Sequence, residues 1–338
     1  MDTLYFSFII PVYNRPDEIE ELLNSFQELE GNFSFEIVII EDGSTIDCKS
    51  VISKFLPVLN ISYYFKANSG PGDSRNYGML KAKGNYFIIL DSDCLLPTNY
   101  LITVNDYLEA YYVDCFGGPD AAHSSFSNLQ KAINFAMTST ITTGGIRGGR
   151  VSGDKFQPRS FNMGLSKLAF KSSGGFGFIH PGEDPDLSIR LNDMGFKTVL
   201  INEAFVYHKR RISWSKFYNQ VYKFGLVRPI LNKWHPETKR LAYWFPTVFS
   251  VGFFLSLLLF VCAGYSLPLA VYGVYLAIAF CLSLVVNRSL NIAFQSILAI
   301  AVQFFGYGLG FFTSTVAISI LNKNPKEQFP KLFFENVT

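Results

Sequence analysis

The chain has 338 residues, of which 49% are hydrophobic and 17% are charged, with a formal net charge of +2. This composition is too apolar for an ordinary soluble enzyme, and no platform of aromatic and basic residues indicates a nucleic-acid partner. The apolar excess is concentrated between residues 241 and 322, where Arg288 is the only charged residue. Because helices of a soluble domain need a polar face, we predict that this C-terminal third is a membrane region.

The beginning of the chain does not have the pattern of a secretory signal peptide. Its apolar run, Tyr5 to Ile10, is short and lacks a basic flank. We therefore expect the first two thirds of the chain to stay in the cytosol. The five cysteines form no Cys-x-x-Cys pair and two of them lie in the apolar third, which is typical of reduced thiols.

The N-terminal part of the chain alternates between short apolar runs and helical patterns. A helix is predicted to begin at Pro16, which two acidic residues and apolar residues at helical spacing follow. Pro11 requires its strand to be at an edge or to end there. The alternation predicts a parallel sheet with helices on both faces. The predicted strands are 6–12, 35–40, 61–65 and 87–90.

Two carboxylates, Asp91 and Asp93, directly follow the predicted strand 87–90. Ligands of open α/β sheets bind at the carboxyl ends of strands. Two hard oxygen donors at this place suit Mg²⁺ or Mn²⁺ that carries a diphosphate. The alternative is a solvated turn, because an Asp-x-Asp pair also occurs by chance.

A second acidic cluster, Glu183 and Asp184, stands where a helix is predicted to begin. Pro185 at the first helical position would make Asp184 the N-cap, which is a structural alternative to a chemical role. Asp186 and Arg190 are four residues apart and are expected to form a helix-surface pair. His208 follows a predicted strand at 204–207, where it is either a structural residue or a ligand.

Four motifs occur in an order that resembles a known enzyme family. They are Phe8-Ile9-Ile10-Pro11-Val12-Tyr13-Asn14, Val38-Ile39-Ile40-Glu41-Asp42-Gly43-Ser44, Gly70-Pro71-Gly72-Asp73-Ser74-Arg75-Asn76-Tyr77-Gly78 and Leu90-Asp91-Ser92-Asp93. Over residues 4 to about 210 the chain resembles the inverting family 2 glycosyltransferases of the GT-A type. The resemblance implies the α/β fold of nucleotide-diphospho-sugar transferases, a mostly parallel sheet flanked by helices, here followed by C-terminal membrane helices.

The resemblance also implies which residues bind the nucleotide and the donor. Asp42 would accept an N–H group of the base, beside the main chain around Pro11 to Tyr13; by itself it is also a good Asx-turn residue before Gly43. Arg75 is similar to an arginine that lines the nucleotide pocket, and its alternative is a charge on a helix surface. The full implied set is Pro11, Val12, Tyr13, Asp42, Arg75, Asn76 and Asp91.

The family's chemistry implies roles for the remaining acidic residues. Asp184 stands where the family has the general base that deprotonates the acceptor hydroxyl, and Glu183 would orient the acceptor. His208 would complete a metal site with Asp91 and Asp93, because imidazole is an acceptable ligand for Mn²⁺. The implied cofactor is Mn²⁺ or Mg²⁺.

The segment that follows His208 is basic and aromatic. Basic charge with large aromatic side chains before an apolar segment suits a helix in the headgroup layer, and the positive charge predicts that residues 1–208 are cytosolic. Ser213 replaces the arginine that processive polysaccharide synthases have before Trp214, which disfavours a polymer-extruding enzyme. The glycine-rich loop 144–153 is either a site for an anionic ligand or a surface loop.

Three apolar segments, 242–263, 267–287 and 290–321, are each long enough to cross a bilayer. We expect a catalytic domain at 1–208, an interfacial segment at 209–240, about three transmembrane helices within 241–322, and a tail. Three crossings would place the lysine-containing tail outside, whereas the positive-inside rule prefers two or four.

The expected protein is a multi-pass enzyme of the inner (cytoplasmic) membrane. It would move one sugar, with inversion, from a nucleoside diphosphate sugar to a hydroxyl of a lipid-linked saccharide or glycolipid in cell-surface glycan synthesis. One alternative is a polyprenyl-phosphate glycosyltransferase, whose phosphate acceptor needs no general base. Another is a non-catalytic nucleotide-sugar-binding membrane subunit. A transporter is disfavoured, because Arg288 alone is charged within the spans.

Overall fold

The computed structural model describes residues 3–121, 123, 125–143, 156–209 and 213–334. The chain divides into two compact units. The α/β unit comprises residues 1–123, 149–209 and 333–338, and the helical unit comprises 124–148 and 210–332. The predicted glycine-rich loop 144–153 lies outside the described residues, as do Arg210 and Arg211.

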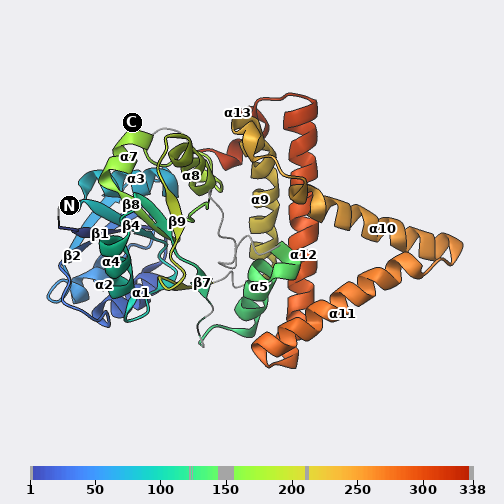
Figure 1. Ribbon diagram of the computed structural model, residues 1–338, viewed down its shortest axis with the longest axis horizontal. Coiled ribbons are helices and arrows are strands. Elements are labelled where there is room, and N and C mark those ends of the chain that lie inside the picture. Colours follow the sequence, from blue (N-terminus) through green and yellow to red (C-terminus); the bar gives the residue numbers. More distant parts are fainter. Residues whose placement is uncertain (1–2, 122, 124, 144–155, 210–212, 335–338) are drawn as a thin grey trace. The chain divides into compact units, whose positions relative to one another are not determined.

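The α/β unit is built on a seven-stranded sheet with the order β3-β2-β1-β4-β8-β6-β9 (Figure 1). Neighbouring strands are parallel except at β8, which is antiparallel to both β4 and β6. The mostly parallel sheet predicted from the sequence is therefore confirmed. The strands are β1 (Phe6–Val12), β2 (Phe35–Asp42), β3 (Ile61–Lys66), β4 (Tyr86–Leu90), β6 (Cys115–Gly117), β8 (Asn162–Ser166) and β9 (Thr198–Leu200).

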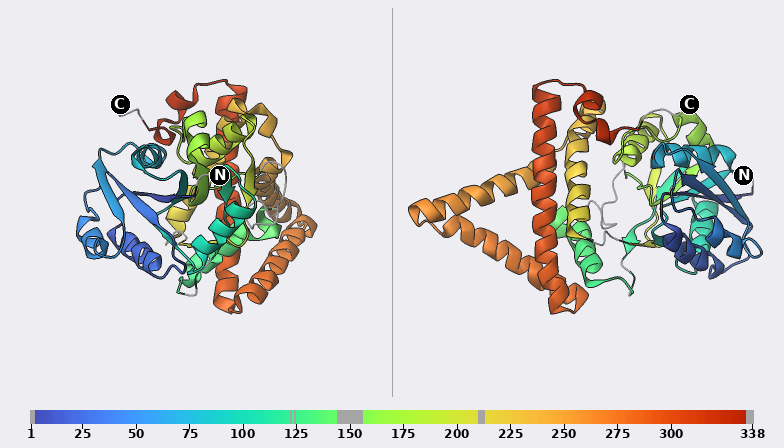
Figure 2. Two further views of the ribbon diagram at one scale, coloured as in Figure 1. Left: turned by 60° about the vertical axis from the view of Figure 1, so that its left-hand side comes forward. Right: turned by 180° about the vertical axis from the view of Figure 1, so that it is seen from behind.

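Helices cover both faces of this sheet (Figures 1 and 2). Successive residues of a strand point to opposite faces, so Phe8 and Ile10 join one core and Ile9 joins the other. The first core includes α1 (Pro16–Gln27), α2 (Lys49–Phe55) and α4 (Tyr100–Ala110). The second includes α3 (Pro71–Lys81), α7 (Lys167–Ser173) and α8 (Glu183–Asp193). The helices predicted on both faces are confirmed.

One local prediction is confirmed and one is corrected. Pro11 is next to the last residue of β1, and the pairing of β1 with β4 ends at Ile9, so the strand leaves this ladder before the proline. Asp184 is not an N-cap: α8 begins at Glu183, and its N-cap is Gly182, whose φ of +127° is open to glycine.

A second sheet of three strands lies beside the end of β4. Its order is β5 (Cys94–Leu95), β10 (Val206–His208) and β7 (Asp120–Ala121). His208 pairs with Cys94, and Tyr207 pairs with Ala121. This small sheet therefore brings the Asp91–Asp93 segment and His208 together from distant parts of the chain.

The end of the described chain also belongs to the α/β unit. Phe333 forms a β-bridge with Ile179, and the N–H of Phe334 donates to the carbonyl oxygen of Phe178 at 3.1 Å. A side chain on Gly70 would collide with the ring of Phe334. The chain thus returns to the α/β unit after it has passed through the helical unit.

The helical unit contains long helices that pack around α12. Its core joins Ile133, Phe217, Ala279 and Phe304 from four helices. The main helices are α5 (Asn128–Thr138), α6 (Thr140–Thr143), α9 (Trp214–Trp234), α10 (Phe245–Ala263), α11 (Leu267–Asn287) and α12 (Leu290–Ser314). Short turns flank them: η1 (Pro236–Thr238), η2 (Leu241–Trp244), η3 (Thr315–Ile320), α13 (Pro325–Gln328) and η4 (Pro330–Leu332).

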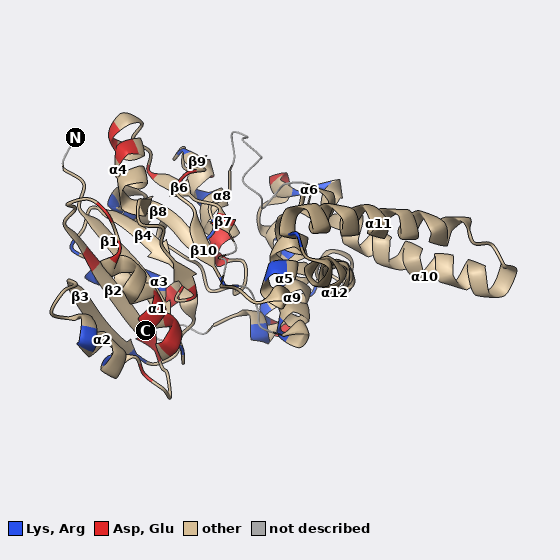
Figure 3. Cartoon of the chain, turned by 90° about the horizontal axis from the view of Figure 1, so that it is seen from below, with Lys and Arg blue, Asp and Glu red and all other residues tan. Residues whose placement is uncertain are grey.

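Within the described residues, three helical stretches are long and apolar enough to cross a membrane: Leu241–Ala263, Leu267–Asn287 and Leu290–Ile320. They match the three apolar segments predicted from the sequence. Figure 3 shows α10 and α11 without the basic residues that mark α5 and α9.

Candidate active site

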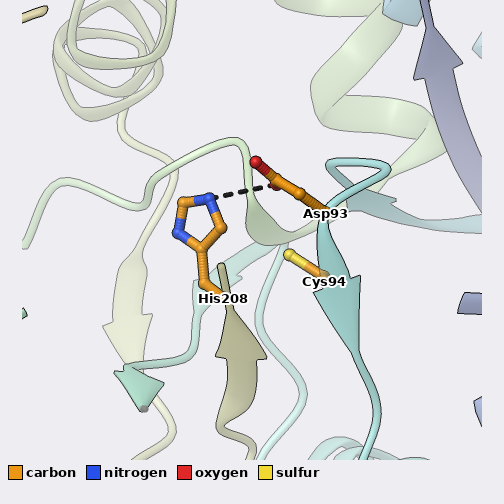
Figure 4. A group of neighbouring side chains, drawn as sticks. All are labelled: Asp93, Cys94 and His208. Carbon is orange, nitrogen blue, oxygen red and sulfur yellow. Dashed lines mark ion pairs between the residues drawn. The ribbon is translucent and has the colours of Figure 1, made fainter. Parts of the chain in front are cut away.

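The two carboxylates that follow β4 have different partners. Asp91 Oδ1 accepts a hydrogen bond from Arg75 Nη2 at 2.7 Å, whereas Asp93 Oδ1 lies 3.2 Å from His208 Nε2. Figure 4 shows the imidazole ring of His208 directed at the carboxylate of Asp93. The short β5–β10 ladder fixes this second pair, because it sets His208 opposite Cys94. The motif therefore divides into an arginine-bound and a histidine-bound carboxylate.

The group around His208 has the ligands for a divalent cation. One possible ligand atom from each of Asp93, Cys94 and His208 lies within 4.8 Å of the other two (Figure 4). Burial, reinforced by Asp93 and Asp91, raises the pKa of the Cys94 thiol well above its ordinary value, and this thiol donates to the carbonyl of Phe161. The donor set is thus one carboxylate and one imidazole, a set that is acceptable to Mn²⁺.

His208 is held from several sides. Its ring stacks on Phe161 with a centroid distance of 4.7 Å. Its Nδ1 lies 3.6 Å from Asp120 Oδ2, on the side of the ring away from Asp93. Flanking carboxylates of this kind fix the orientation of a metal-binding histidine. The structure therefore places Asp93 and His208 together, while Asp91 is outside the group of possible ligands.

Arg75 connects the Asp91–Asp93 segment to the second acidic cluster. Its side chain is only 4% exposed, and its Nη1 donates to Glu183 Oε1 at 3.0 Å while its Nη2 donates to Asp91. Phe176 covers the guanidinium at 5.3 Å from the ring centroid. A buried arginine between two carboxylates fixes their separation, because the planar guanidinium directs its donors in set directions. Both predicted acidic clusters therefore belong to one site.

Glu183 and Asp184 are neighbours with opposite pKa shifts. Burial opposes ionisation of Glu183, but His180, at 2.9 Å, and Arg75 outweigh it and lower the pKa of this carboxyl. Burial, reinforced by the charge of Glu183, raises the pKa of Asp184 in spite of Arg159 at 3.7 Å. Carboxylates whose environments separate their pKa values are a common feature of acid–base sites. Glu183 is thus a fixed anion, and Asp184 is the more basic group.

The predicted nucleotide-binding residues have mixed surroundings. Both oxygens of Asp42 are used within the unit, by the N–H groups of Ser69 and Gly70 and by Lys66. Asn76 makes two hydrogen bonds to the main chain of Phe176. Asp42 and Asn76 therefore stabilise the loop after β3 and the helix α3 that follows it. A ligand contact of either side chain would be additional to these hydrogen bonds. Pro11 and Val12 are buried in β1, and Tyr13 is 51% exposed.

Several residues of the site were missed by the sequence reasoning. They are Lys66, Asp120, Arg159 and His180, which contact Asp42, His208, Asp184 and Glu183 respectively. His180 stands three residues before Glu183, a spacing that could have predicted its contact. The other three are distant in sequence from their partners, so only the tertiary structure reveals them.

The chain is similar to known proteins over part of its length. The model of a protein family described as "Glycosyl transferase family 2" matches residues 7–178. An uncharacterized glycosyltransferase of Rickettsia bellii is 41% identical over 99 residues, which are 28% of this chain and 14% of that protein. A poly(ribitol-phosphate) beta-N-acetylglucosaminyltransferase, TarS of Staphylococcus aureus, is 31% identical over 112 residues, 32% of this chain and 20% of TarS. The chain thus aligns with a fifth or less of the length of these relatives.

A solved structure extends the likeness to the fold. The mannosyltransferase PcManGT from Pyrobaculum calidifontis, in complex with GDP-Man and Mn²⁺, superposes with a TM-score of 0.58 at 17% sequence identity. The superposition covers 88% of this chain and 86% of PcManGT. The family model covers half of the chain and includes β1 to β8 with the Asp91–Asp93 segment. The chain belongs to glycosyl transferase family 2.

Proposed function

We propose that this protein is an inverting, membrane-anchored glycosyltransferase. It transfers a sugar from a nucleoside diphosphate sugar to a hydroxyl of a lipid-linked saccharide or glycolipid at the cytosolic face of the inner membrane. The observation that carries the proposal is the contact of Arg75 with both Asp91 and Glu183. One buried cation holds the carboxylate at the end of β4 beside the acidic start of α8, where donor and acceptor would meet.

Asp184 is the group best suited to accept the acceptor's proton. Its pKa is raised mainly by burial, which brings a carboxylate nearer to the pH at which a general base is effective. Its side chain is 17% exposed, so it can be reached by a hydroxyl. Glu183 remains ionised between Arg75 and His180, and its role is to fix this end of α8 and to orient the acceptor.

The proposed reaction follows from these placements. Asp184 takes the proton as the acceptor oxygen attacks the anomeric carbon from the face opposite the diphosphate. The new carbon–oxygen bond forms while the bond to the diphosphate oxygen breaks, and the configuration inverts. A divalent cation held by Asp93 and His208 would neutralise the charge of the leaving diphosphate. No second catalytic acid is then required, and the diphosphate leaves as an anion.

The apolar helices support a membrane location and hence a lipid-linked acceptor. The protein buries only 11% of the most apolar part of Leu241–Ala263, which contains α10, and 11% of that part of Leu267–Asn287, which is α11. Bare apolar surface of this extent is what a bilayer covers. The basic residues of α9, among them Lys216, Lys223 and Lys233, support a cytosolic location of the α/β unit.

The proposal is tested by measuring the release of nucleoside diphosphate from a panel of nucleoside diphosphate sugars. The full-length protein, purified in lipid nanodiscs, is supplied with Mn²⁺, each donor and mixed membrane lipids. We expect one donor to give a lipid-dependent release of nucleoside diphosphate and a glycosylated lipid product. Donor binding without any release, with every donor and lipid extract, would instead favour a non-catalytic nucleotide-sugar-binding subunit.

A further inference from the structure

Helices α9 and α12 lie side by side and run in the same direction. A side chain on Gly306 would meet Val221, and one on Gly310 would collide with the carbonyl oxygen of Tyr222. Further along, Lys233 Nζ donates to Asn322 Oδ1 at 2.7 Å. The views of Figures 1 and 2 agree on this parallel pair. Glycines let the two backbones approach closely, so the pair is one packed unit along the length of α9.

The earlier part of α12 is packed against α5. Ile133 and Ala136 of α5 share one core with Ala299 and Ile300 of α12. The hydroxyl of Tyr275 in α11 donates to the carbonyl oxygen of Ile141, just after α5. α12 is therefore accompanied along its length by α5 and α9, and neither of these is among the apolar stretches that could cross a membrane.

Short connections in the chain join α5, α9 and the end of α12 to the α/β unit. His123 and Lys209, which belong to that unit, stand a few residues before α5 and α9. After Ile320 the chain reaches the bridge between Phe333 and Ile179 through α13 and η4. This connection carries Lys323, Lys326 and Lys331. A short lysine-containing segment cannot lie across a hydrocarbon core, so the end of α12 is on the same side of the bilayer as the α/β unit.

The three apolar helices also differ in how much of their surface the protein covers. The protein buries 44% of the most apolar part of Leu290–Ile320, the stretch that contains α12. It buries only 11% of that part in Leu241–Ala263 and in Leu267–Asn287. The large exposed apolar residues of α12 repeat near the helical period and fall on one face. They are Leu290, Phe294, Leu298, Leu309 and Phe312. The other faces of α12 are covered by α5 and α9, so only one face is left for lipid, whereas α10 and α11 expose apolar side chains all round.

We propose that only α10 and α11 cross the bilayer, as a hairpin, and that α12 lies in its surface beside α9. The chain then crosses twice, with Ser266 at the far side and both ends of the chain on the side of the α/β unit. This arrangement removes the conflict between three crossings and the lysines of the tail. It shares with the proposed function the premise of a membrane-bound protein, but it does not depend on the reaction.

Labelling of single cysteines tests the number of crossings. In a C262A/C281A background, K81C reports the α/β unit, S266C the hairpin tip and E327C the chain after α12; all three positions are exposed. A membrane-impermeant maleimide is applied to sealed vesicles of each orientation. We expect K81C and E327C to react from one side and S266C from the other only. Reaction of E327C from the side opposite K81C, or of S266C from any side but the far one, would overturn the proposal.

The depth of α12 is tested with a fluorophore on F294C, L298C, L309C and F312C, in vesicles that carry quenchers at known depths. A crossing helix would separate Phe294 from Phe312 by about 27 Å along its axis. We expect one shallow depth for all four, while the control pair V248C and F260C on α10 differ. Depths that change steadily along α12, or no quenching because a second copy covers it, would overturn the proposal. Loss of glycosyl transfer with this labelling pattern unchanged would count against the proposed function alone.

Discussion

Arg75 Nη1 and Glu183 Oε1 lie 3.0 Å apart although 108 residues separate them in the chain. The same guanidinium holds Asp91 at 2.7 Å. The three side chains come from α3, α8 and the end of β4, so this contact joins distant parts of the α/β unit at the site. Donor binding and base catalysis both depend on this junction.

Removal of Arg75 should destabilise the protein more than removal of an exposed arginine. Arg75→Gln leaves Glu183 buried with His180 as its remaining partner, which costs about 3 kcal/mol, near the low end for buried pairs because His180 remains and because Asp91 is partly exposed and can be hydrated. Arg15→Gln, which breaks an exposed pair with Glu18, should cost less than about 1 kcal/mol. Thermal unfolding in detergent measures both. Equal midpoints for the two variants would contradict the structural role of Arg75.

The metal site should depend on His208 and not on Cys94. His208→Asn removes the imidazole, so the affinity for Mn²⁺, measured by the electron paramagnetic resonance of free Mn²⁺, should fall about tenfold or more. Cys94→Ala should retain the affinity, because the buried neutral thiol donates to Phe161 and is a poor ligand. Loss of Mn²⁺ binding in Cys94→Ala with an unchanged fold would show that the thiol is a ligand after all.

The two carboxylates of the Asp91–Asp93 segment should also differ in their effect on the affinity for Mn²⁺. Asp93→Asn should lower the affinity for Mn²⁺ about tenfold or more in the absence of donor, because Asp93 faces His208. Asp91→Asn should have a smaller effect, because Arg75 already pairs with this carboxylate. The reverse order would mean that Asp91 leaves Arg75 and binds the metal, the role that the sequence predicts for both carboxylates.

The pH dependence of transfer should report Asp184 through Arg159. Transfer needs the ionised carboxylate, and burial raises the pKa of Asp184, so the acid limb of kcat/KM should lie above the ordinary aspartate value of about 3.9. Arg159 lowers this pKa, so Arg159→Gln should move the limb to higher pH. Lys197→Gln removes an exposed charge from the same unit and should leave the limb in place. A limb that does not respond to Arg159→Gln would identify another group as the base.

Much of the fold could be predicted from the sequence because its signals are local. The apolar runs of β1, β2 and β4 are continuous, which is what strands buried on both faces require, and all three were predicted within two residues. The apolar helices were predicted with similar accuracy, since Arg288 alone interrupts them. The start of α8 was wrong by a few residues, because the positive φ of Gly182 supplies the N-cap and the sequence pattern pointed to Asp184 and Pro185.

The site could be predicted only in its residue types. Asp91 and Asp93 suggested a single metal-binding pair, yet long-range contacts with Arg75 and His208 divide them. The contact of Asp42 with the nucleotide base stays a prediction, and the sequence does not predict that Lys66, Ser69 and Gly70 also bind its oxygens. A spacing in sequence shows which chemistry is available, but the partner of each carboxylate depends on strands and helices that the spacing does not place.

The most direct test of the account is transfer by Asp184→Asn, with Asp193→Asn at the exposed end of the same helix as the matched control. The measurement is single-turnover formation of glycosylated lipid with donor and Mn²⁺ bound. We predict that Asp184→Asn binds both ligands normally but transfers roughly 10²–10⁴-fold more slowly, while Asp193→Asn is unaffected. Normal transfer by Asp184→Asn would contradict the account and favour a phosphate acceptor that needs no general base.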